Sequence, residues 1–145
     1  MTRQRNDSHS TEFGIWLRKQ RDISSSIGFI ATNLDYMWQN YKTGEWMFLE
    51  EKRHNSKMTW SQSQQFEVID AAVRNCIKYR GFHLIVFGNT SPDDGLIFID
   101  DEEVSNKDLL EFLRFDKRKE WYISYFKKKN KKSSPNAATL REETA

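Results

Sequence analysis

Two carboxylates and one ammonium group in the first half of the chain have types and a spacing that suit hydrolytic chemistry. Asp35 is followed after fourteen intervening residues by Glu50, and Lys52 comes two positions later. Residues two apart in a strand project from the same face, so Glu50 and Lys52 are expected to lie side by side. Glu51 would point to the other face, or leave only its backbone carbonyl near the pair.

Together these groups suit the hydrolysis of a phosphodiester bond. Asp35 and Glu50 are hard oxygen ligands that can hold Mg²⁺ or Mn²⁺ while leaving coordination positions for a water and a phosphate oxygen. A metal held in this way polarises the phosphate and lowers the pKa of its bound water. Lys52 can orient that water, help to deprotonate it and offset the charge that develops in the transition state.

A short hairpin is expected to bring these residues together. Residues 34–40 and 45–52 are rich in aromatic and aliphatic side chains, as strands are, and the four residues between them end on Gly44, which suits a tight turn. With those four residues in the loop, Asp35 lies opposite Glu50. A slip of one residue would move the side chains to the other face, so the prediction depends on this register.

The remaining pattern predicts a mixed α/β sheet with helices packed against it. The expected elements are a helix over 11–21, a helix over 59–78 opened by a Thr59–Gln62 capping box, a strand over 82–87, a turn over 91–95, a strand over 96–99, a helix opened by Ser105 and Asp108, and a segment over 120–126 that fits either a strand or a helix. In the second helix, four apolar residues recur at helical spacing and are expected in the core: Phe66, Ile69, Val73 and Ile77.

Length and composition predict one globular domain. The 145 residues have room for a single core, and 14% aromatic residues are more than a disordered chain carries. Residues 1–10 are polar and are expected to be a flexible N-terminus, and the domain is expected over 11–126. Residues 127–145 are rich in lysine and nearly without large apolar side chains, so this tail is expected to be disordered.

Composition also favours a cytoplasmic, reducing setting. No apolar run is long enough to cross a bilayer, and the polar N-terminus lacks the apolar stretch of a signal peptide. The single cysteine, Cys76, excludes an internal disulfide, and its apolar neighbours predict a buried structural thiol.

The net charge of +2 does not describe a uniformly basic surface. Residues 127–145 hold six Lys and Arg against two Glu, so the rest of the chain is slightly acidic. A nucleic acid would therefore be bound by local patches, by the basic tail, or through a metal ion that offsets the acidic centre.

The stretch that carries the reactive groups resembles the core of the PD-(D/E)XK nuclease superfamily, also called the restriction-endonuclease-like fold. It runs N-L-D-Y-M-W-Q-N-Y-K-T-G-E-W-M-F-L-E-E-K, and its E-x-K motif ends a strand that follows a hairpin and precedes a long helix. Leu34 stands where the family usually has proline. The likeness covers about residues 11–100 and is to small phage-type or Holliday-junction-resolvase-type members.

The resemblance implies a restriction-endonuclease-like mixed sheet flanked by helices, and a metal-dependent nuclease with DNA favoured over RNA as its substrate. It implies that the aspartate and first glutamate of the motif hold Mg²⁺ or Mn²⁺ and that Lys52 acts on the water. A glutamate on the first helix and a glutamine on the helix after the motif often support such sites. The expected catalytic residues are Asp35, Glu50, Lys52 and Gln62, and the expected metal ligands are Asp35, Glu50, Glu51 and Glu12.

Each of these residues also has an ordinary structural explanation. Glu50 and Lys52 suit an exposed ion pair on an edge strand, which contributes little to stability. Glu12 suits a helix N-terminal acid favoured by the helix dipole, and Gln62 suits a capping box. The lysine cluster at 127–132 fits either a nucleic-acid tether or a solubilising tail.

Two other functions fit the same sequence. A non-catalytic nucleic-acid-binding protein with this fold would keep its binding after chelation and after Lys52→Ala. A protein-interaction module would show neither nucleic-acid binding nor a specific divalent-ion site. For the nuclease, the chain has little room for a recognition domain, which favours low sequence specificity, and a homodimer would place two sites on two strands.

Overall fold

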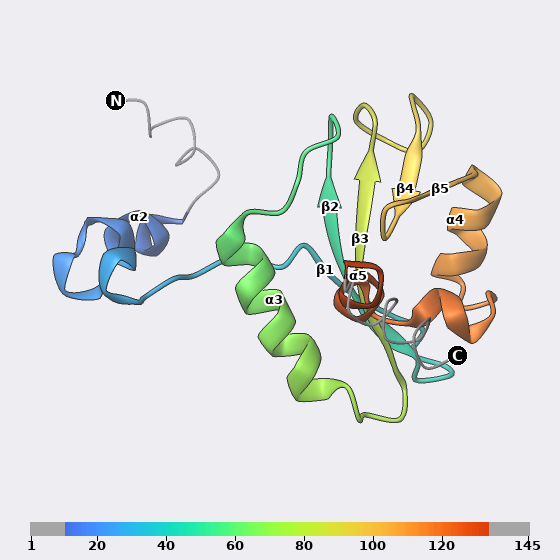
Figure 1. Cartoon of the computed structure of the whole chain (residues 1–145), viewed down its shortest axis with the longest axis horizontal. Coiled ribbons are helices and arrows are strands. Elements are labelled where there is room, and N and C mark those ends of the chain that lie inside the picture. Colours follow the sequence, from blue (N-terminus) through green and yellow to red (C-terminus); the bar gives the residue numbers. More distant parts are fainter. Residues whose placement is uncertain (1–10, 134–145) are drawn as a thin grey trace, which may run out of the picture. The chain divides into compact units, whose positions relative to one another are not determined.

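The computed structural model describes residues 11–133, and these divide into two compact units (Figure 1). The first unit ends at Thr32 and the second begins at Asn33. The predicted domain over 11–126 spans both units and stays a prediction. The predicted flexible N-terminus, residues 1–10, lies outside the described residues.

The first unit, over its described residues 11–32, is an α-helix followed by two short 3-10 turns. Helix α2 spans Glu12–Lys19, and η1 (Arg21–Ile23) and η2 (Ser25–Ile27) follow it. The side-chain oxygen of Thr11 accepts a hydrogen bond from the backbone N–H of Gly14 at 3.1 Å, which satisfies a free donor at the helix N-terminus. The helix predicted over 11–21 is therefore confirmed.

The second unit is built on a mixed sheet, as the sequence predicted. Its described residues form five strands in the spatial order β1-β2-β3-β4-β5. The strands are β1 (Tyr36–Gln39), β2 (Trp46–Lys52), β3 (Tyr79–Phe87), β4 (Ile97–Ile99) and β5 (Glu102–Val104). β2 and β3 run parallel, and the other neighbouring pairs are antiparallel. β5 was not among the predicted strands.

The β1–β2 hairpin has the predicted register. Tyr36 pairs with Leu49, and the backbone N–H of Asn40 donates to the carbonyl of Glu45 at 2.9 Å. Gly44 closes the loop with a φ of 86°, a left-handed conformation that glycine adopts without strain. Tyr36 and Leu49 are the last pair of the hairpin on the side away from its turn. Asp35 and Glu50 are the next residues on its two arms and therefore lie across from each other.

Helix α3 (Trp60–Val73) is the crossover that the parallel pairing of β2 and β3 requires. Its capping box is formed in both halves, so the predicted start is confirmed. The predicted end at Lys78 is wrong: the helix stops at Val73, and the chain turns, with the N–H of Cys76 donating to the carbonyl of Val73 at 2.9 Å. Ile77 is consequently 88% exposed rather than in the core, and Cys76 is exposed rather than buried.

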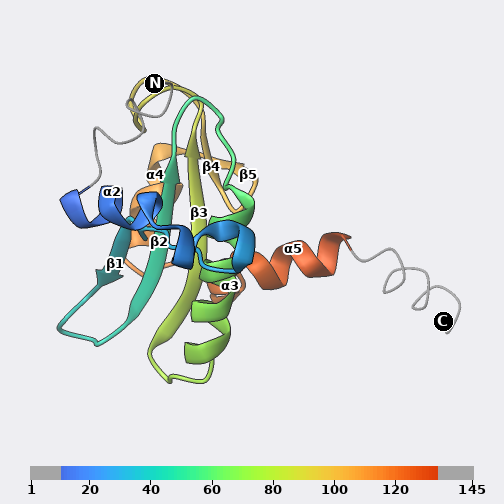
Figure 2. The same cartoon turned by 90° about the vertical axis from the view of Figure 1, so that its left-hand side faces the viewer.

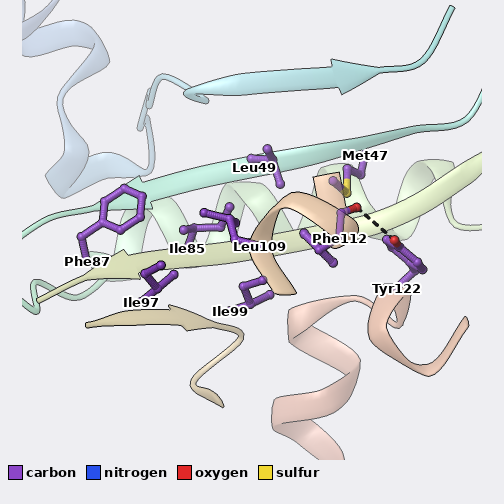
Figure 3. Close-up of a cluster of buried hydrophobic side chains, with 9 residues drawn as sticks. All are labelled: Met47, Leu49, Ile85, Phe87, Ile97, Ile99, Leu109, Phe112 and Tyr122. Carbon is purple, nitrogen blue, oxygen red and sulfur yellow. Dashed lines mark hydrogen bonds between the residues drawn. The ribbon is translucent and has the colours of Figure 1, made fainter. Parts of the chain in front are cut away.

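Helices cover both faces of this sheet (Figure 1). Helix α4 (Asn106–Leu113), opened by the predicted Ser105–Asp108 capping box, packs on one face together with η3 (Lys119–Tyr122). In the core beneath it, the Tyr122 hydroxyl donates to the carbonyl of Phe112 at 2.9 Å (Figure 3). Helix α3 packs on the other face through Phe66, beside residues of helix α5.

Helix α5 (Tyr125–Ser133) corrects the predicted tail. Tyr125 and Phe126 are buried against Phe82 and its neighbours, and the helix they begin projects beyond the sheet (Figure 2). Residues 127–133, predicted to be disordered, are therefore helical, while residues 134–145 lie outside the described part of the chain. None of the helices within residues 11–133 is long and apolar enough to cross a membrane.

A buried carboxylate ties the β4–β5 turn to β3 and α5. Asp100 and Asp101 form a two-residue turn in which both φ angles are positive, at 51° and 71°. The Asp100 side chain accepts hydrogen bonds from the backbone N–H of Leu84 at 2.9 Å and from the Lys128 ammonium at 2.7 Å. It also lies 2.7 Å from Nδ1 of the fully buried His83.

The ring of His83 lies between two oxygen atoms. Its Nε2 lies 2.6 Å from the carbonyl oxygen of Arg80, which can only accept a hydrogen bond, and Nδ1 faces the Asp100 carboxylate. Each ring nitrogen therefore lies against an oxygen that can accept a hydrogen bond. Asp100 is thus the counter-charge of Lys128 and a hydrogen-bond partner of His83.

Replacing this carboxylate by an amide should destabilise the protein strongly. Asp100→Asn keeps a residue that tolerates positive φ but removes the charge that compensates Lys128 and alters the hydrogen bond with His83. We expect the free energy of unfolding, measured with urea at neutral pH, to fall by about 3 kcal/mol. The control is Asp101→Asn, an exposed residue of the same turn, with an expected change within about 0.5 kcal/mol. Equal losses for the two variants would show that the turn and not the buried charge matters.

Candidate functional site

Glu50, Lys52 and Gln62 form a closed set of contacts on the face of the sheet that α3 covers. The Lys52 ammonium lies 3.3 Å from Oε2 of Glu50 and donates to Oε1 of Gln62 at 2.8 Å. The Gln62 amide in turn donates to Oε2 of Glu50 at 3.3 Å. The predicted neighbours Glu50 and Lys52 do share a face, and α3 adds the glutamine.

The explanation of Glu50 and Lys52 as an exposed pair on an edge strand does not apply. β2 lies between β1 and β3, and only 2% of the Glu50 surface is exposed. Removing a carboxylate from water costs several kcal/mol even when a cation lies beside it. Such a group in the interior of a sheet is a candidate functional residue.

Gln62 takes part in the capping box and in the site at once. Its backbone N–H donates to the Thr59 hydroxyl at 3.1 Å, and its side-chain Oε1 accepts from the backbone N–H of Thr59 at 3.1 Å. The same oxygen accepts from Lys52. The capping box is therefore confirmed, the catalytic role of Gln62 stays a prediction, and the first turn of α3 fixes the orientation of the amide that faces Glu50.

Asp35 adjoins the buried group from the exposed side. Its backbone N–H lies 3.4 Å from Oε1 of Glu50, and its carboxylate accepts a hydrogen bond from the backbone N–H of Glu51 at 2.8 Å. Asp35 is exposed whereas Glu50 is buried. An exposed carboxylate thus adjoins a buried one, and Asp35 is the member of the two that solvent reaches.

Of the other two predicted metal ligands, Glu51 points its side chain away from Glu50. The Glu51 carboxylate accepts from Nε of Arg53 at 3.0 Å and from the Tyr36 hydroxyl at 3.4 Å, on the face opposite to Glu50. Glu51 therefore contributes its backbone amide, which holds Asp35, rather than its side chain. Glu12 lies in the first turn of α2, in the first unit, and its role as a ligand stays a prediction.

The electrostatics of the pair favour a cation. Burial, and secondly the charge of Asp35, raise the pKa of Glu50 from its ordinary value of 4.5 to about 7, while Lys52 opposes this shift. A divalent cation between Asp35 and Glu50 would reverse the repulsion. Within residues 11–133, no three or more His, Cys, Asp or Glu side chains come together as a metal site. Two carboxylates completed by waters and phosphate oxygens are, however, an ordinary donor set for Mg²⁺.

A hollow of about 490 Å³, here called the lateral groove, opens on the same face of the sheet. Its lining includes an apolar floor of Leu84, Val86 and Phe98 and a polar rim of Lys57, Ser63 and Lys129. Leu84 and Val86 are the β3 partners of Glu50 and Lys52, so the floor begins one strand away from them. Sequence reasoning missed this groove because segments far apart in the chain build it, and no local spacing marks them.

Comparisons with known proteins give no match to any family model, curated protein or solved structure. The resemblance to the PD-(D/E)XK superfamily therefore depends on the motif and its structural setting.

Replacing Glu50 by glutamine should change how stability depends on pH. The pKa of Glu50 is higher in the folded chain, about 7, than its ordinary 4.5, so the folded state binds this proton more tightly. The wild type should therefore lose stability as the pH rises from about 4.5 through 7. Without metal, the stability of Glu50→Gln relative to the wild type should rise by up to about 3 kcal/mol between pH 5 and pH 8.

Urea unfolding in EDTA at several pH values measures this difference. Glu103→Gln, at an exposed position of β5, is the control and should follow the wild-type pH dependence. If the Glu50→Gln curve also ran parallel to that of the wild type, Glu50 would have an ordinary pKa and the electrostatic argument would be wrong.

Proposed function

We propose that this chain is a metal-dependent nuclease of the PD-(D/E)XK type, which hydrolyses phosphodiester bonds and prefers DNA to RNA. The observation that carries the proposal is the contact of the buried Glu50 with Lys52 and Gln62 beside the exposed Asp35. A buried carboxylate, an exposed carboxylate and an adjacent ammonium are groups that can hold a cation and meet a phosphate at the same place.

The arrangement of the strands gives further support. The motif strand β2 is the second strand of an antiparallel hairpin, and α3 leads from it to a parallel neighbour, β3. The reactive residues lie at the end of β2 that leads into the crossover. In open, mostly parallel sheets, ligands bind outside the carboxyl ends of the strands; here Lys52 is the last residue of β2, at the carboxyl end of the parallel β2–β3 pair.

In this proposal Asp35 and Glu50 hold Mg²⁺ or Mn²⁺. When bound, the metal polarises the phosphate and lowers the pKa of a coordinated water. Lys52 orients the attacking water and stabilises the negative charge that develops on the phosphate oxygens. Gln62 positions the Lys52 ammonium, and the capping box of α3 holds Gln62 in place.

The first test of the proposal is metal-dependent cutting. Single-stranded, duplex and branched DNA, and RNA, are incubated with the protein in Mg²⁺, in Mn²⁺ and in EDTA. We expect cutting that EDTA abolishes and that Lys52→Ala lowers by about 100-fold or more, because the variant loses its charge at the phosphate. Lys107→Ala, at an exposed position of α4 on the opposite face, should cut like the wild type.

Urea unfolding of each variant separates loss of chemistry from loss of fold. If a folded Lys52→Ala variant and the wild type bind nucleic acid equally well and neither cuts, the chain is a non-catalytic binding protein. Absence of both binding and cutting favours the protein-interaction module.

Competition between protons and metal gives a second test. Because the pKa of Glu50 without a cation is about 7, metal must displace a proton from the site below that pH. We expect cutting at limiting Mg²⁺ to rise about tenfold per pH unit below pH 7 and to level off above it. The midpoint should move to lower pH as the Mg²⁺ concentration increases. A pH profile that does not change with Mg²⁺ concentration would show that Glu50 is not a ligand of the metal.

A further inference from the structure

We propose that the lateral groove holds unpaired nucleotides next to the scissile phosphate, so that the preferred substrate carries a single-stranded segment beside the cut. This inference rests on the proposed nuclease function and names the substrate class of the same site. Its basis is the position of the groove, its lining and its size.

The groove adjoins the reactive residues directly. Leu84 on its floor is the β3 partner of Glu50, Val86 is the partner of Lys52, and Phe98 on β4 is the partner of Val86. Neighbouring strands are about 4.8 Å apart, so the floor lies about 5 to 10 Å from the reactive row. A strand whose phosphate sits at Lys52 can therefore reach the groove with its adjacent nucleotide.

The floor is suited to the faces of bases. Leu84 and Val86 are buried beneath the hollow, and the half-buried Phe98 and Met58 give it partly exposed aromatic and apolar surface. Every base has an apolar face that can lie on such a surface, and this contact does not depend on sequence. The hydroxyl of Ser63, on the helix turn that carries Gln62, adds a polar group at the side nearest the site.

The rim is suited to a phosphate backbone. Lys57 and Lys129 are exposed at the groove, opposite one exposed carboxylate, Asp101. The ammonium of Lys129 donates to the Tyr125 hydroxyl at 3.1 Å, which holds the charge at the rim. Cations around an apolar floor complement a single strand, whose bases and phosphates face different ways.

The size favours one strand over two. A hollow of about 490 Å³ is within the range of pockets that hold small organic molecules. Such a volume suits a ligand of about the size of a nucleotide, whereas paired bases stacked in a duplex present their edges and not their faces. The nucleotides that enter the groove must therefore be unpaired.

Binding in EDTA tests this inference without cutting. Fluorescence anisotropy compares a labelled single strand, a blunt duplex of the same sequence, and that duplex with a single-stranded overhang. Two groove variants are used: Ser63→Phe, which fills the hollow without a change of charge, and the double variant Lys57→Glu with Lys129→Glu. The matched control reverses two exposed lysines away from the groove, Lys42 in the β1–β2 turn and Lys107 on α4.

We expect the wild type to bind the overhang duplex and the single strand more tightly than the blunt duplex. Ser63→Phe should weaken binding to the first two by about 10-fold or more, and to the blunt duplex by less than about threefold. The Lys57→Glu/Lys129→Glu variant should lower the ratio of the affinity for the overhang duplex to the affinity for the blunt duplex. The control variant should leave this ratio unchanged. Urea unfolding confirms that each variant is folded.

Equal affinity of the wild type for the blunt and overhang duplexes would overturn the inference. So would a Ser63→Phe variant that loses the same affinity for the single strand, the blunt duplex and the overhang duplex. The outcome is separate from that of the cutting test. Cutting without a preference for unpaired segments would support the nuclease function and contradict the proposed role of the groove. A groove-dependent binding preference without any cutting would support the role of the groove and contradict the nuclease function.

Discussion

The burial of the Glu50 carboxylate is the constraint on which the rest of this site depends. A charge that is 2% exposed inside a sheet is tolerated only if its partners are held in place, and here they come from three segments. Lys52 comes from the same strand, Gln62 from α3 and the backbone of Asp35 from the start of the hairpin. The hairpin register, the position of α3 and the protonation of Glu50 are therefore coupled to one another.

Helix α3 transmits this constraint to the loop that precedes it. Since the oxygen of Gln62 serves both Thr59 and Lys52, the amide cannot turn away from the site without opening the capping box. The first helical turn thus acts as the rigid support that functional side chains need if they are to stay in a defined geometry. The same turn carries Ser63 to the lateral groove, so the site and the groove share one wall.

The two faces of the sheet differ in kind. Beneath α4 and η3, apolar side chains close around Phe112 and Tyr122, and this face supplies hydrophobic stability (Figure 3). The opposite face carries the buried Glu50, a second apolar cluster and the groove. On that side the cationic α5 is anchored through Lys128 to Asp100, so a basic segment is fixed to the sheet by a buried ion pair.

The sequence by itself determined the features that depend on neighbours in the chain. Loop length and the alternation of strand side chains set the register that places Asp35 across from Glu50, and the capping residues Thr59 and Ser105 set where α3 and α4 begin.

Only the tertiary structure decided the features that depend on distant partners. α3 ends at Val73 and not at Lys78 because the chain must turn to pair β3 with β2, and this turn exposes Cys76 and Ile77. The lysine-rich segment is helical because it continues helix α5, whose first residues, Tyr125 and Phe126, pack on β3. The composition of the segment does not reveal this stabilising contact. The raised pKa of Glu50 and the groove beside it likewise arise from side chains far apart in sequence, since burial and charge proximity are properties of the folded chain.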